Sequence, residues 1–397
     1  MFTKRIDRIQ PSATLEMTSK AAELKRNNKP VYNMSVGEPD FSTPQNIQEA
    51  GIYAIENGFT KYTPGSGTYD LKKAICEKLE RDNGLLYDNE NIVVSCGGKH
   101  SLYNACQALF QAGDEVIIFK PYWVSFPDFV SVTGATPIFV ETKQDKQNEP
   151  DFEDLKKKIN KKTKGIIINS PSNPTGGVWG DSAVERLLDF LSDYPEVWIF
   201  SDECYEQLTY NKKFKSIASF NKHNKKIITF QSCSKTYAMT GWRIGYIAGD
   251  KDLVRAIGKL QGQSTSCPNS IGQYAAIEAL TGDQSCVGQM RTIFKNRRNL
   301  ILSELSTIDH VVCEKPNGAF YVFPDFSYYL QFTDTENNMI KTSSDLSLYI
   351  LRTTGVVSVA GDSFGAPGFI RFSYATSDET IIEAMGLVKN TIKKLGF

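Results

Sequence analysis

One lysine, Lys235, lies among small hydroxylated residues in the stretch SCSKTYAMTGWRIGY (232–246). Ser232 and Ser234 flank it, and Arg243 follows eight residues later. Hydroxyl groups and a guanidinium suit a phosphate, because arginine can donate two parallel hydrogen bonds to its oxygens. A lysine amine can form a Schiff base with a carbonyl group. The stretch therefore indicates a lysine nucleophile beside a phosphate site, although alone it also fits an exposed loop with an incidental basic residue.

Polar residues also follow four other apolar runs. Each group alone has an ordinary explanation, such as a glycine turn before a helix, a core tryptophan, a turn cap or a helix cap. Five strand ends carry such groups, counting the one with Lys235. Chance placement is therefore a poor explanation for all of these residues together. The groups are Gly97, Gly98 and Lys99 after 91–95, Trp123 after 115–119, Asn173 after 165–169, and Asp202 with Tyr205 after 197–201.

The elements that must position these residues are short apolar runs alternating with helix-like stretches. This alternation predicts an α/β fold, with a large domain built on an open, mostly parallel sheet covered by helices. Ligands bind such sheets outside the carboxyl ends of the strands, where the polar groups lie. The expected strands are 91–95, 115–119, 136–140, 165–169, 197–201, 226–230 and 243–249.

The two ends of the chain have a different pattern. A long charged helix pattern at 289–308 leads to short apolar runs at 318–326, 356–361 and 368–375, and then to a closing helix. We expect a smaller α+β domain made of residues 1–44 and 291–397, beside a large cofactor-binding domain of residues 45–290.

These residue types together suit pyridoxal phosphate, a flat, phosphorylated aromatic aldehyde. Lys235 would bond to the aldehyde, and burial near Arg243 would lower the pKa of its amine from about 10.4. Asp202 would keep the ring nitrogen protonated, so that the ring withdraws electrons from a carbanion. Asn173 and Tyr205 would hold the ring hydroxyl. The phosphate would be held by Ser232, Ser234, Arg243, Gly98 and Lys99.

The chain also carries, in order, motifs that cover nearly its full length. With them it resembles the class I aminotransferases, which are fold-type I pyridoxal-phosphate enzymes, and especially their bacterial aspartate aminotransferase branch. The motifs are GEPDFSTP (37–44), KYTPGSG (61–67), GGKHSLYN (97–104), PYWVSFP (121–127), NSPSNPTG (169–176), SDECYE (201–206), SKTYAMTGWRIGY (234–246), NGAFYVF (317–323) and IRFSYATS (370–377).

The resemblance implies further roles. Lys235 would also shuttle the proton between the substrate Cα and the cofactor, and Trp123 would stack on the cofactor ring. Arg371 would clamp the substrate α-carboxylate, assisted by the Gly37 backbone and Asn173. Tyr62 would reach the phosphate of a neighbouring subunit, which implies a homodimer with shared sites. As isolated residues, Arg371 fits a surface ion pair and Tyr62 fits a packed loop residue.

The side chain of the amino-acid substrate is inferred from the resemblance alone. In the branch that the chain resembles, a distal carboxylate meets a lysine and N-terminal hydroxyls, here Lys99, Ser12 and Thr14. This implies transfer from L-aspartate to 2-oxoglutarate. If Lys99 faces water, the alternative is an aminotransferase for aromatic or other neutral amino acids, and a β-lyase or synthase is a lesser one. Transfer between prephenate and glutamate is a further alternative. Gln10 counts against it, because prephenate-using members often have a basic residue at this position.

Composition excludes several other classes. The net charge is zero over 397 residues, so no basic field attracts nucleic acid or an anionic membrane. The eight cysteines form no CxxC pair and no zinc spacing, and three histidines form no metal or hydrolase motif. We expect reduced thiols, a cytoplasmic protein, no metal, no secretory signal and no membrane helix. A regulatory module that binds pyridoxal phosphate without turnover usually follows a DNA-reading domain, for which the first dozen residues leave no room.

Overall fold

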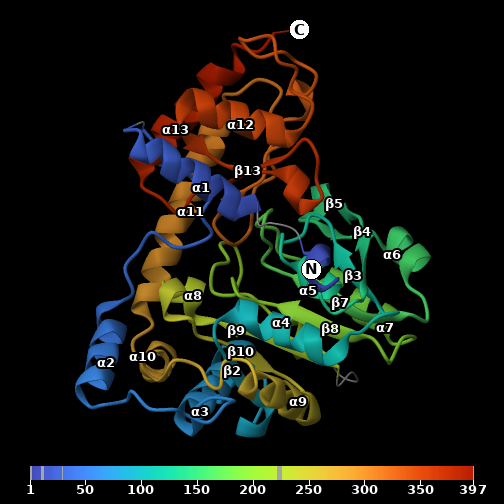
Figure 1. Ribbon diagram of the computed structural model, residues 1–397, viewed down its shortest axis with the longest axis vertical. Helices are drawn as coiled ribbons and strands as arrows, with labels where there is room; N and C mark the ends of the chain where they lie inside the picture. The colour runs from blue at the N-terminus through green and yellow to red at the C-terminus, as the bar shows by residue number, and fades with distance from the viewer. Residues whose placement is uncertain (1, 10–12, 29, 221–225, 397) are drawn as a thin grey trace.

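A seven-stranded sheet forms the centre of the structure (Figure 1), a computed structural model that describes residues 2–9, 13–28, 30–220 and 226–396. The strand order is β2-β10-β9-β8-β7-β3-β4, and β10 alone is antiparallel to its neighbours in this sheet. All seven expected strands are present. Their bounds are β2 (Ile92–Ser95), β3 (Glu115–Phe119), β4 (Thr136–Val140), β7 (Thr163–Asn169), β8 (Trp198–Asp202), β9 (Ile227–Ser232) and β10 (Gly245–Ala248).

Helices cover both faces of this sheet, which explains why its strands are apolar on both sides. In β2, the side chain of Val93 packs with Leu102 of α4, whereas Val94 packs on the other face with Ile75 of α3. The helices of this part are α2 (Gln45–Glu56), α3 (Tyr69–Lys78), α4 (Gly98–Leu109), α5 (Phe126–Ser131), α6 (Phe152–Lys158), α7 (Asp181–Leu191), α8 (Cys233–Thr236), α9 (Lys251–Gly262) and α10 (Ser270–Thr281).

The two ends of the chain come together beside the sheet. β1 (Tyr32–Asn33) pairs in parallel with β12 (Val356–Val357), and α1 (Ala13–Arg26) lies near the C-terminal helices (Figure 1). A second, antiparallel sheet has the order β11-β14-β13. The remaining elements here are α11 (Ser285–Leu305), β11 (Tyr321–Val322), α12 (Ser343–Thr354), β13 (Val359–Ala360), β14 (Ile370–Ser373) and α13 (Asp378–Ile392).

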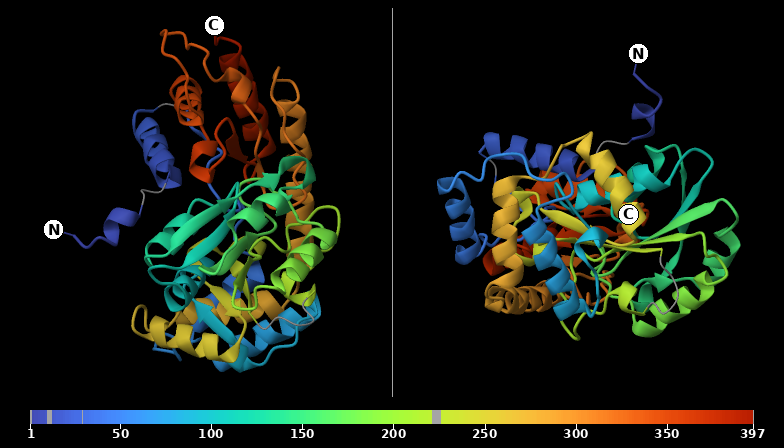
Figure 2. Two further views of the ribbon diagram at one scale, coloured as in Figure 1. Left: turned by 90° about the vertical axis from the view of Figure 1, so that its right-hand side faces the viewer. Right: turned by 90° about the horizontal axis from the view of Figure 1, so that it is seen from below.

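The long helix α11 runs from the neighbourhood of α10 up to α13 (Figure 1), where it packs against the C-terminal core. It therefore crosses the downstream boundary of the expected domain at residues 45–290, and that division remains a prediction. Figure 2 shows the N-terminal segment, residues 2–9, extending away from the rest of the chain. Among the described residues, no helix is both long and apolar enough to cross a bilayer.

Short elements complete the chain. A small antiparallel pair, β5 with β6, joins β4 to α6. One of the short helical segments, η2, is a π-helix that continues directly from α3. The bounds are β5 (Thr142–Lys143), β6 (Glu149–Pro150), η1 (Ile6–Arg8), η2 (Leu79–Asn83), η3 (Asn89–Asn91), η4 (Gln144–Lys146), η5 (Ile217–Phe220), η6 (Thr240–Trp242), η7 (Ser327–Tyr329) and η8 (Gly361–Phe364).

Candidate active site

A cavity of about 270 Å³ lies at the carboxyl ends of the central strands. Most of the residues singled out in the sequence line it, although they come from segments far apart in the chain. Arg371 comes from the small sheet and Gly37 from the loop after β1, so the cavity lies where the two parts of the molecule meet. The lining includes Gly37, Gly98, Lys99, Trp123, Asn173, Asp202, Tyr205, Ser232, Ser234, Lys235, Arg243 and Arg371.

Strand register brings the polar residues of neighbouring strands together. Asn169 at the end of β7 lies opposite Asp202 at the end of β8. The Asn169 side chain donates to the Asp202 main-chain oxygen (3.2 Å) and accepts from the Asn173 main-chain nitrogen (2.7 Å). The next strand, β9, ends at Ser232, and the short helix α8 then carries Lys235. Parallel pairing thus places the turn with Asn173 and the lysine on either side of Asp202.

Lys235 has the surroundings that an amine nucleophile needs. Its Nζ donates to the main-chain oxygen of Gly37. Burial lowers the pKa of Lys235 from its ordinary value. The nearby Cys204 and Glu38 oppose this shift in part, whereas the positive charges of Arg243 and Arg371 add to it. A larger fraction of this amine is therefore neutral than of an exposed lysine, as a nucleophile or a base requires.

Asp202 is a buried carboxyl group, only 4% exposed. Its Oδ1 accepts a hydrogen bond from the Cys204 main-chain nitrogen (3.2 Å). Burial raises the pKa of Asp202 to about 6, and the nearby charge of Lys235 opposes that rise only in part. A cationic N–H group in the cavity would stabilise the ionised Asp202 carboxylate. A protonated ring nitrogen is such a group.

One end of the cavity is suited to a phosphate. Gly98 begins α4, whose N-cap residue Gly97 (φ 87°) provides no side-chain cap, so the first N–H groups of the helix are available. Ser232 Oγ lies 2.9 Å from Ser234 Oγ. A Cβ atom at Gly97 would clash with the Arg243 guanidinium, so glycine permits this close approach. Backbone N–H groups, hydroxyls and an arginine form a complete anion-binding set.

Arg243 differs from the expectation in its backbone. It precedes β10 instead of opening that strand, and it has a left-handed conformation (φ 59°) after η6. Its Nη1 donates to the main-chain oxygen of Thr240 (2.7 Å). Because of this turn, strand pairing begins at Gly245, two residues later than the apolar pattern indicated.

Arg371 is held firmly at the opposite side of the cavity and is 2% exposed. Its Nη1 donates to Asn173 Oδ1 (2.8 Å) and its Nη2 donates to the Ser35 main-chain oxygen (2.5 Å). The guanidinium lies over the rings of Tyr321 (4.6 Å to the centroid) and Phe364 (5.1 Å). Its buried Nε has no hydrogen-bond partner among the described residues, so the group retains donors for a carboxylate.

Lys99 and Trp123 form a pair at the cavity. Lys99 Nζ lies 4.9 Å from the centroid of the Trp123 ring. The Trp123 ring is in turn packed edge-to-face against Phe126 and Phe129. Partial desolvation and the charge of Arg243 lower the pKa of Lys99, although solvent still reaches its side chain. A second anionic group in the cavity would relieve the repulsion between these two cations.

One expected site residue that the structure describes, Tyr62, does not line the cavity. Tyr62 is 89% exposed, so within a single chain it contacts no part of the site. Thr14 lies within helix α1, but its side chain is outside the described part of the structure. Ser12 falls outside the described residues, as does Gln10.

The cavity also contains residues to which the sequence analysis assigned no role. The Tyr321 hydroxyl lies 2.8 Å from the Tyr205 hydroxyl, and both side chains are buried. Burial and the neighbouring Tyr321 raise the pKa of Tyr205 well above its ordinary value, so Tyr205 is a neutral donor. Tyr321 lies within the NGAFYVF motif, whose apolar run drew attention to a strand and not to a hydroxyl. The other such residues are Leu102, Asn169, Cys204, Phe230, Gln231 and Thr240.

The donor set as a whole fits a flat, phosphorylated ring with a carbonyl group. An amine, a buried carboxyl, a phenol donor and an anion site line one cavity, with an aromatic side chain beside them. In the described part of the chain, no group of three or more His, Cys, Asp or Glu side chains is placed to hold a metal ion.

Comparison with known proteins identifies the family. Residues 29–387 match the family described as "Aminotransferase class I and II". A probable aspartate/prephenate aminotransferase of Rhizobium leguminosarum bv. phaseoli is 44% identical over 382 residues, which are 96% of this chain and 95% of that protein. A probable aspartate/prephenate aminotransferase of Aquifex aeolicus (strain VF5) is 40% identical and covers 99% of both chains.

Solved structures agree with the sequence matches. The crystal structure of the aspartate aminotransferase from Rhizobium meliloti superposes with a TM-score of 0.96 at 38% identity, over 100% of both chains. Thermus thermophilus aspartate aminotransferase with maleate superposes with a TM-score of 0.92 at 35% identity, over 98% of this chain and 99% of that one. The matched residues cover most of the chain, and the chain belongs to the class I and II aminotransferases.

Proposed function

We propose that this protein is a pyridoxal-phosphate-dependent aspartate aminotransferase. The amino group of L-aspartate passes to 2-oxoglutarate, so that oxaloacetate and L-glutamate are the products. The observation that carries the proposal is the meeting of Lys235, Asp202 and Arg371 in one cavity. Pyridoxal phosphate, when bound, supplies the aldehyde that takes up the amino group and the ring that draws electrons from the substrate Cα.

The residues of the chain have separate tasks in this reaction. Lys235, with its lowered pKa, is the base that moves the proton at the substrate Cα. Asp202 holds the proton on the ring nitrogen, and Asn173 and Tyr205 hold the ring hydroxyl. The position of the Tyr205 side chain at the cavity supports this role, because a tyrosine hydroxyl is protonated and can donate at neutral pH.

Binding of the cofactor and of the substrate backbone uses the two ends of the cavity. The guanidinium of Arg371 receives the α-carboxylate, with Asn173 and the Gly37 main chain beside it. Trp123 packs against the ring. The phosphate is bound by Gly98, Lys99, Ser232, Ser234 and Arg243, with the N-terminus of α4.

For the substrate side chain we propose a distal carboxylate, read by Lys99. Its position at the cavity beside Arg243 supports this, because two cations there favour a second anion. The names of the relatives include aspartate, and one solved relative holds maleate, a dicarboxylate. The resemblance to the aspartate aminotransferase branch implies that Ser12 and Thr14 assist. A pocket with a cation discriminates strongly against an apolar substrate that leaves the cation unpaired.

A half-reaction titration tests this assignment. The enzyme loaded with pyridoxal phosphate is mixed with L-aspartate or L-alanine, without an acceptor, and the loss of visible absorbance is followed. We expect the preference for aspartate to fall at least about 10-fold in Lys99→Met, because one charge-assisted contact is lost. A preference of the wild-type protein for alanine would contradict aspartate and favour the neutral-substrate alternative.

Prephenate is a second candidate for the amino acceptor. The relatives with 44% and 40% identity carry aspartate and prephenate together in their names. Gln10, which argued against prephenate, lies outside the described residues. The comparison to make is the rate at which prephenate and 2-oxoglutarate restore the visible absorbance of the amino-loaded enzyme, and no recovery with prephenate would remove this candidate.

We further propose a homodimer whose sites are shared, with Tyr62 reaching the partner's phosphate. Its 89% exposure supports this, as do the exposed apolar side chains of α2 and of residues 2–9. These include Ile52 (53%), Ile55 (58%) and Phe2 (87%), which a second copy of the chain would cover. A sedimentation mass of one chain for the active protein would contradict the dimer.

We assign the protein to the cytoplasm, as its composition suggested. All eight cysteines are free, which suits a reducing compartment. Cell fractionation that recovered the enzyme outside the cytoplasm would contradict this.

A further inference from the structure

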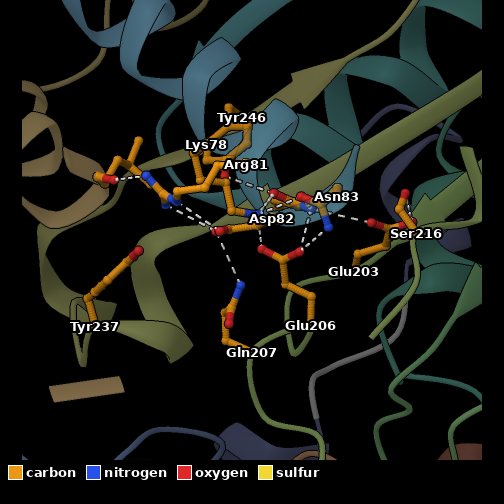
Figure 3. A network of polar contacts seen from close by, with 12 residues as sticks. Lys78, Arg81, Asp82, Asn83, Glu203, Glu206, Gln207, Ser216, Tyr237 and Tyr246 are labelled. Atoms are coloured by element: carbon orange, nitrogen blue, oxygen red, sulfur yellow. Dashed lines mark hydrogen bonds and ion pairs between the residues drawn. The ribbon is translucent and has the colours of Figure 1, made fainter. Parts of the chain in front are cut away.

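Figure 3 shows a buried network of polar side chains. The network reaches the cavity through Gln231, and the proposed reaction uses none of its members. Lys78, the last residue of α3, is 2% exposed. Around it lie Glu203 (0%), Glu206 (6%), Asn83 (9%) and Gln231 (2%). Charged residues are almost never buried to this degree unless they are paired.

The ammonium group of Lys78 uses all three of its donors. It donates to Glu206 Oε1, to Asn83 Oδ1 (2.9 Å) and to Gln231 Oε1 (2.7 Å). Glu206 Oε2 accepts from Asn83 Nδ2 (2.7 Å) and from Gln231 Nε2 (3.0 Å). The Tyr246 hydroxyl donates to Gln231 Oε1 (2.8 Å). The contacts therefore form closed rings around one cation.

Glu203 extends the network towards the end of β8. Its Oε1 accepts from the hydroxyls of Ser201 and Ser216, both at 2.8 Å, and its Oε2 accepts from Gln231 Nε2 (3.3 Å). Burial, together with the charge of Glu206, raises the pKa of Glu203 to about 7. Glu203 directly follows Asp202 in the chain.

The π-helix η2 makes the Asn83 contact possible. It runs from Leu79 to Asn83, directly after Lys78. Residues five apart lie nearly on one face of a π-helix, but not of an α-helix. Lys78 and Asn83 therefore both face Glu206. Such turns are frequent at functional sites.

Glu206 and Gln231, two partners of Lys78, are close in sequence to residues of the site. Glu206 follows Tyr205, and Gln231 precedes Lys235 by four residues. Tyr246, which bonds to Gln231, follows Arg243 by three residues. The network thus connects the separate segments that deliver these residues. Stability alone explains it poorly, because well-packed apolar side chains often replace a buried ion pair without loss of stability.

We propose that Lys78 is a positioning residue, whose bonds to Glu206 and Gln231 fix the segment of Asp202 and Tyr205 relative to the segment of Lys235. The inference rests on the function proposed above. Misplacement of a reacting group by about 1 Å can cost about 100-fold in rate. Arg371 comes from β14, outside this network, so substrate affinity should change little.

The test is the double variant Lys78→Met, Glu206→Leu, studied as full-length enzyme. Single replacement of Lys78 leaves a buried carboxylate unpaired and lowers the melting temperature, whereas the double variant removes both charges. Asn83 and Gln231 can then bond to each other, since Gln231 Nε2 already lies 3.5 Å from Asn83 Oδ1. We expect the double variant to melt near the wild-type temperature, with kcat at least about 10-fold lower and KM within about 3-fold.

Binding of the cofactor supplies a second readout. The visible band that forms when pyridoxal phosphate bonds to Lys235 should appear at least about 10-fold more slowly in the double variant. Pyridoxamine phosphate has no aldehyde, so its affinity should stay within about 3-fold. Arg298→Met is the matched control, because Arg298 is 1% exposed but lies outside the cavity. It should lower the melting temperature and leave kcat unchanged.

A double variant with a wild-type kcat and wild-type band formation would overturn the inference and leave the proposed function intact. Failure of the wild-type protein to form the band would instead overturn the proposed function. If the double variant does not fold, kcat of the variant Gln231→Leu tests the positioning role instead. This variant leaves Lys78 paired with Glu206 and removes the bonds of Gln231 to Lys78, Glu206, Glu203 and Tyr246. We expect kcat to fall at least about 5-fold, and an unchanged kcat would refute the positioning role.

Discussion

Replacement of Arg371 by lysine should weaken the binding of every amino acid to the same degree. The substitution keeps the charge but removes the planar fork that can hold both oxygens of a carboxylate. The guanidinium is held by Asn173 and by the Ser35 main chain, and it lies over the Tyr321 ring. A lysine ammonium cannot make these contacts and also reach both carboxylate oxygens.

The magnitude follows from the number of bonds lost. One charge-assisted hydrogen bond contributes about 1.5–3 kcal/mol. Loss of one of the two bonds to the carboxylate therefore weakens substrate binding by about 10- to 100-fold. The loss arises at the α-carboxylate, which all amino acids share. The ratio of the affinities for L-aspartate and L-alanine should therefore stay constant in Arg371→Lys, in contrast to Lys99→Met.

The assay measures KM for both amino acids in wild type and Arg371→Lys, with the affinity for pyridoxal phosphate and the melting temperature as controls for the fold. A KM within about 3-fold of wild type for both substrates would refute the clamp, because such a change is below the cost of one bond. A loss confined to aspartate would place the distal carboxylate at Arg371 instead.

Two further predictions concern Asp202 and Tyr321. Folding raises the pKa of Asp202 to about 6, so its stabilisation of the apoprotein is complete below about pH 4 and is lost as the pH rises through 6. Urea unfolding of apo Asp202→Asn should therefore show a decline between these pH values that is about 2 kcal/mol smaller than in wild type. Equal declines would contradict it. Tyr321→Phe removes the hydroxyl beside Tyr205 and should lower kcat about 5-fold, for a bond of about 1 kcal/mol. Tyr374→Phe, which removes the contact with Tyr210 (3.1 Å), is the matched control and should leave kcat unchanged; equal effects of the two variants would refute a specific role for Tyr321.

The sequence predicted the central sheet well because each strand has a local pattern. Helices cover both faces of the sheet, so a central strand such as Glu115–Phe119 is apolar at nearly every position. Such a run of consecutive apolar residues can be recognised in the sequence. The position of Asp202 beside Asn169 then follows from parallel pairing, because the strands end at one edge of the sheet. Thus the strand-end residues of the site were predictable from the fold class alone.

Contacts between distant segments were not predictable in this way. Arg371 and Asn173 are 198 residues apart, and no local pattern indicates that their side chains meet. The family motifs supplied that pairing as an expectation. Tyr321 and Lys78 were missed because one lies in an apolar run and the other in an ordinary amphipathic helix. The left-handed turn at Arg243 also has no signature in residue types, since such conformations are uncommon outside glycine.

The central claim is that the amine of Lys235 meets the aldehyde of pyridoxal phosphate. The most direct measurement is to load the full-length protein with the cofactor, reduce it with borohydride, digest it and locate the added mass. We predict one cofactor per chain on the peptide that contains Lys235, and none on Lys235→Ala. Attachment to a different lysine, or no attachment in the wild-type protein, would contradict the account.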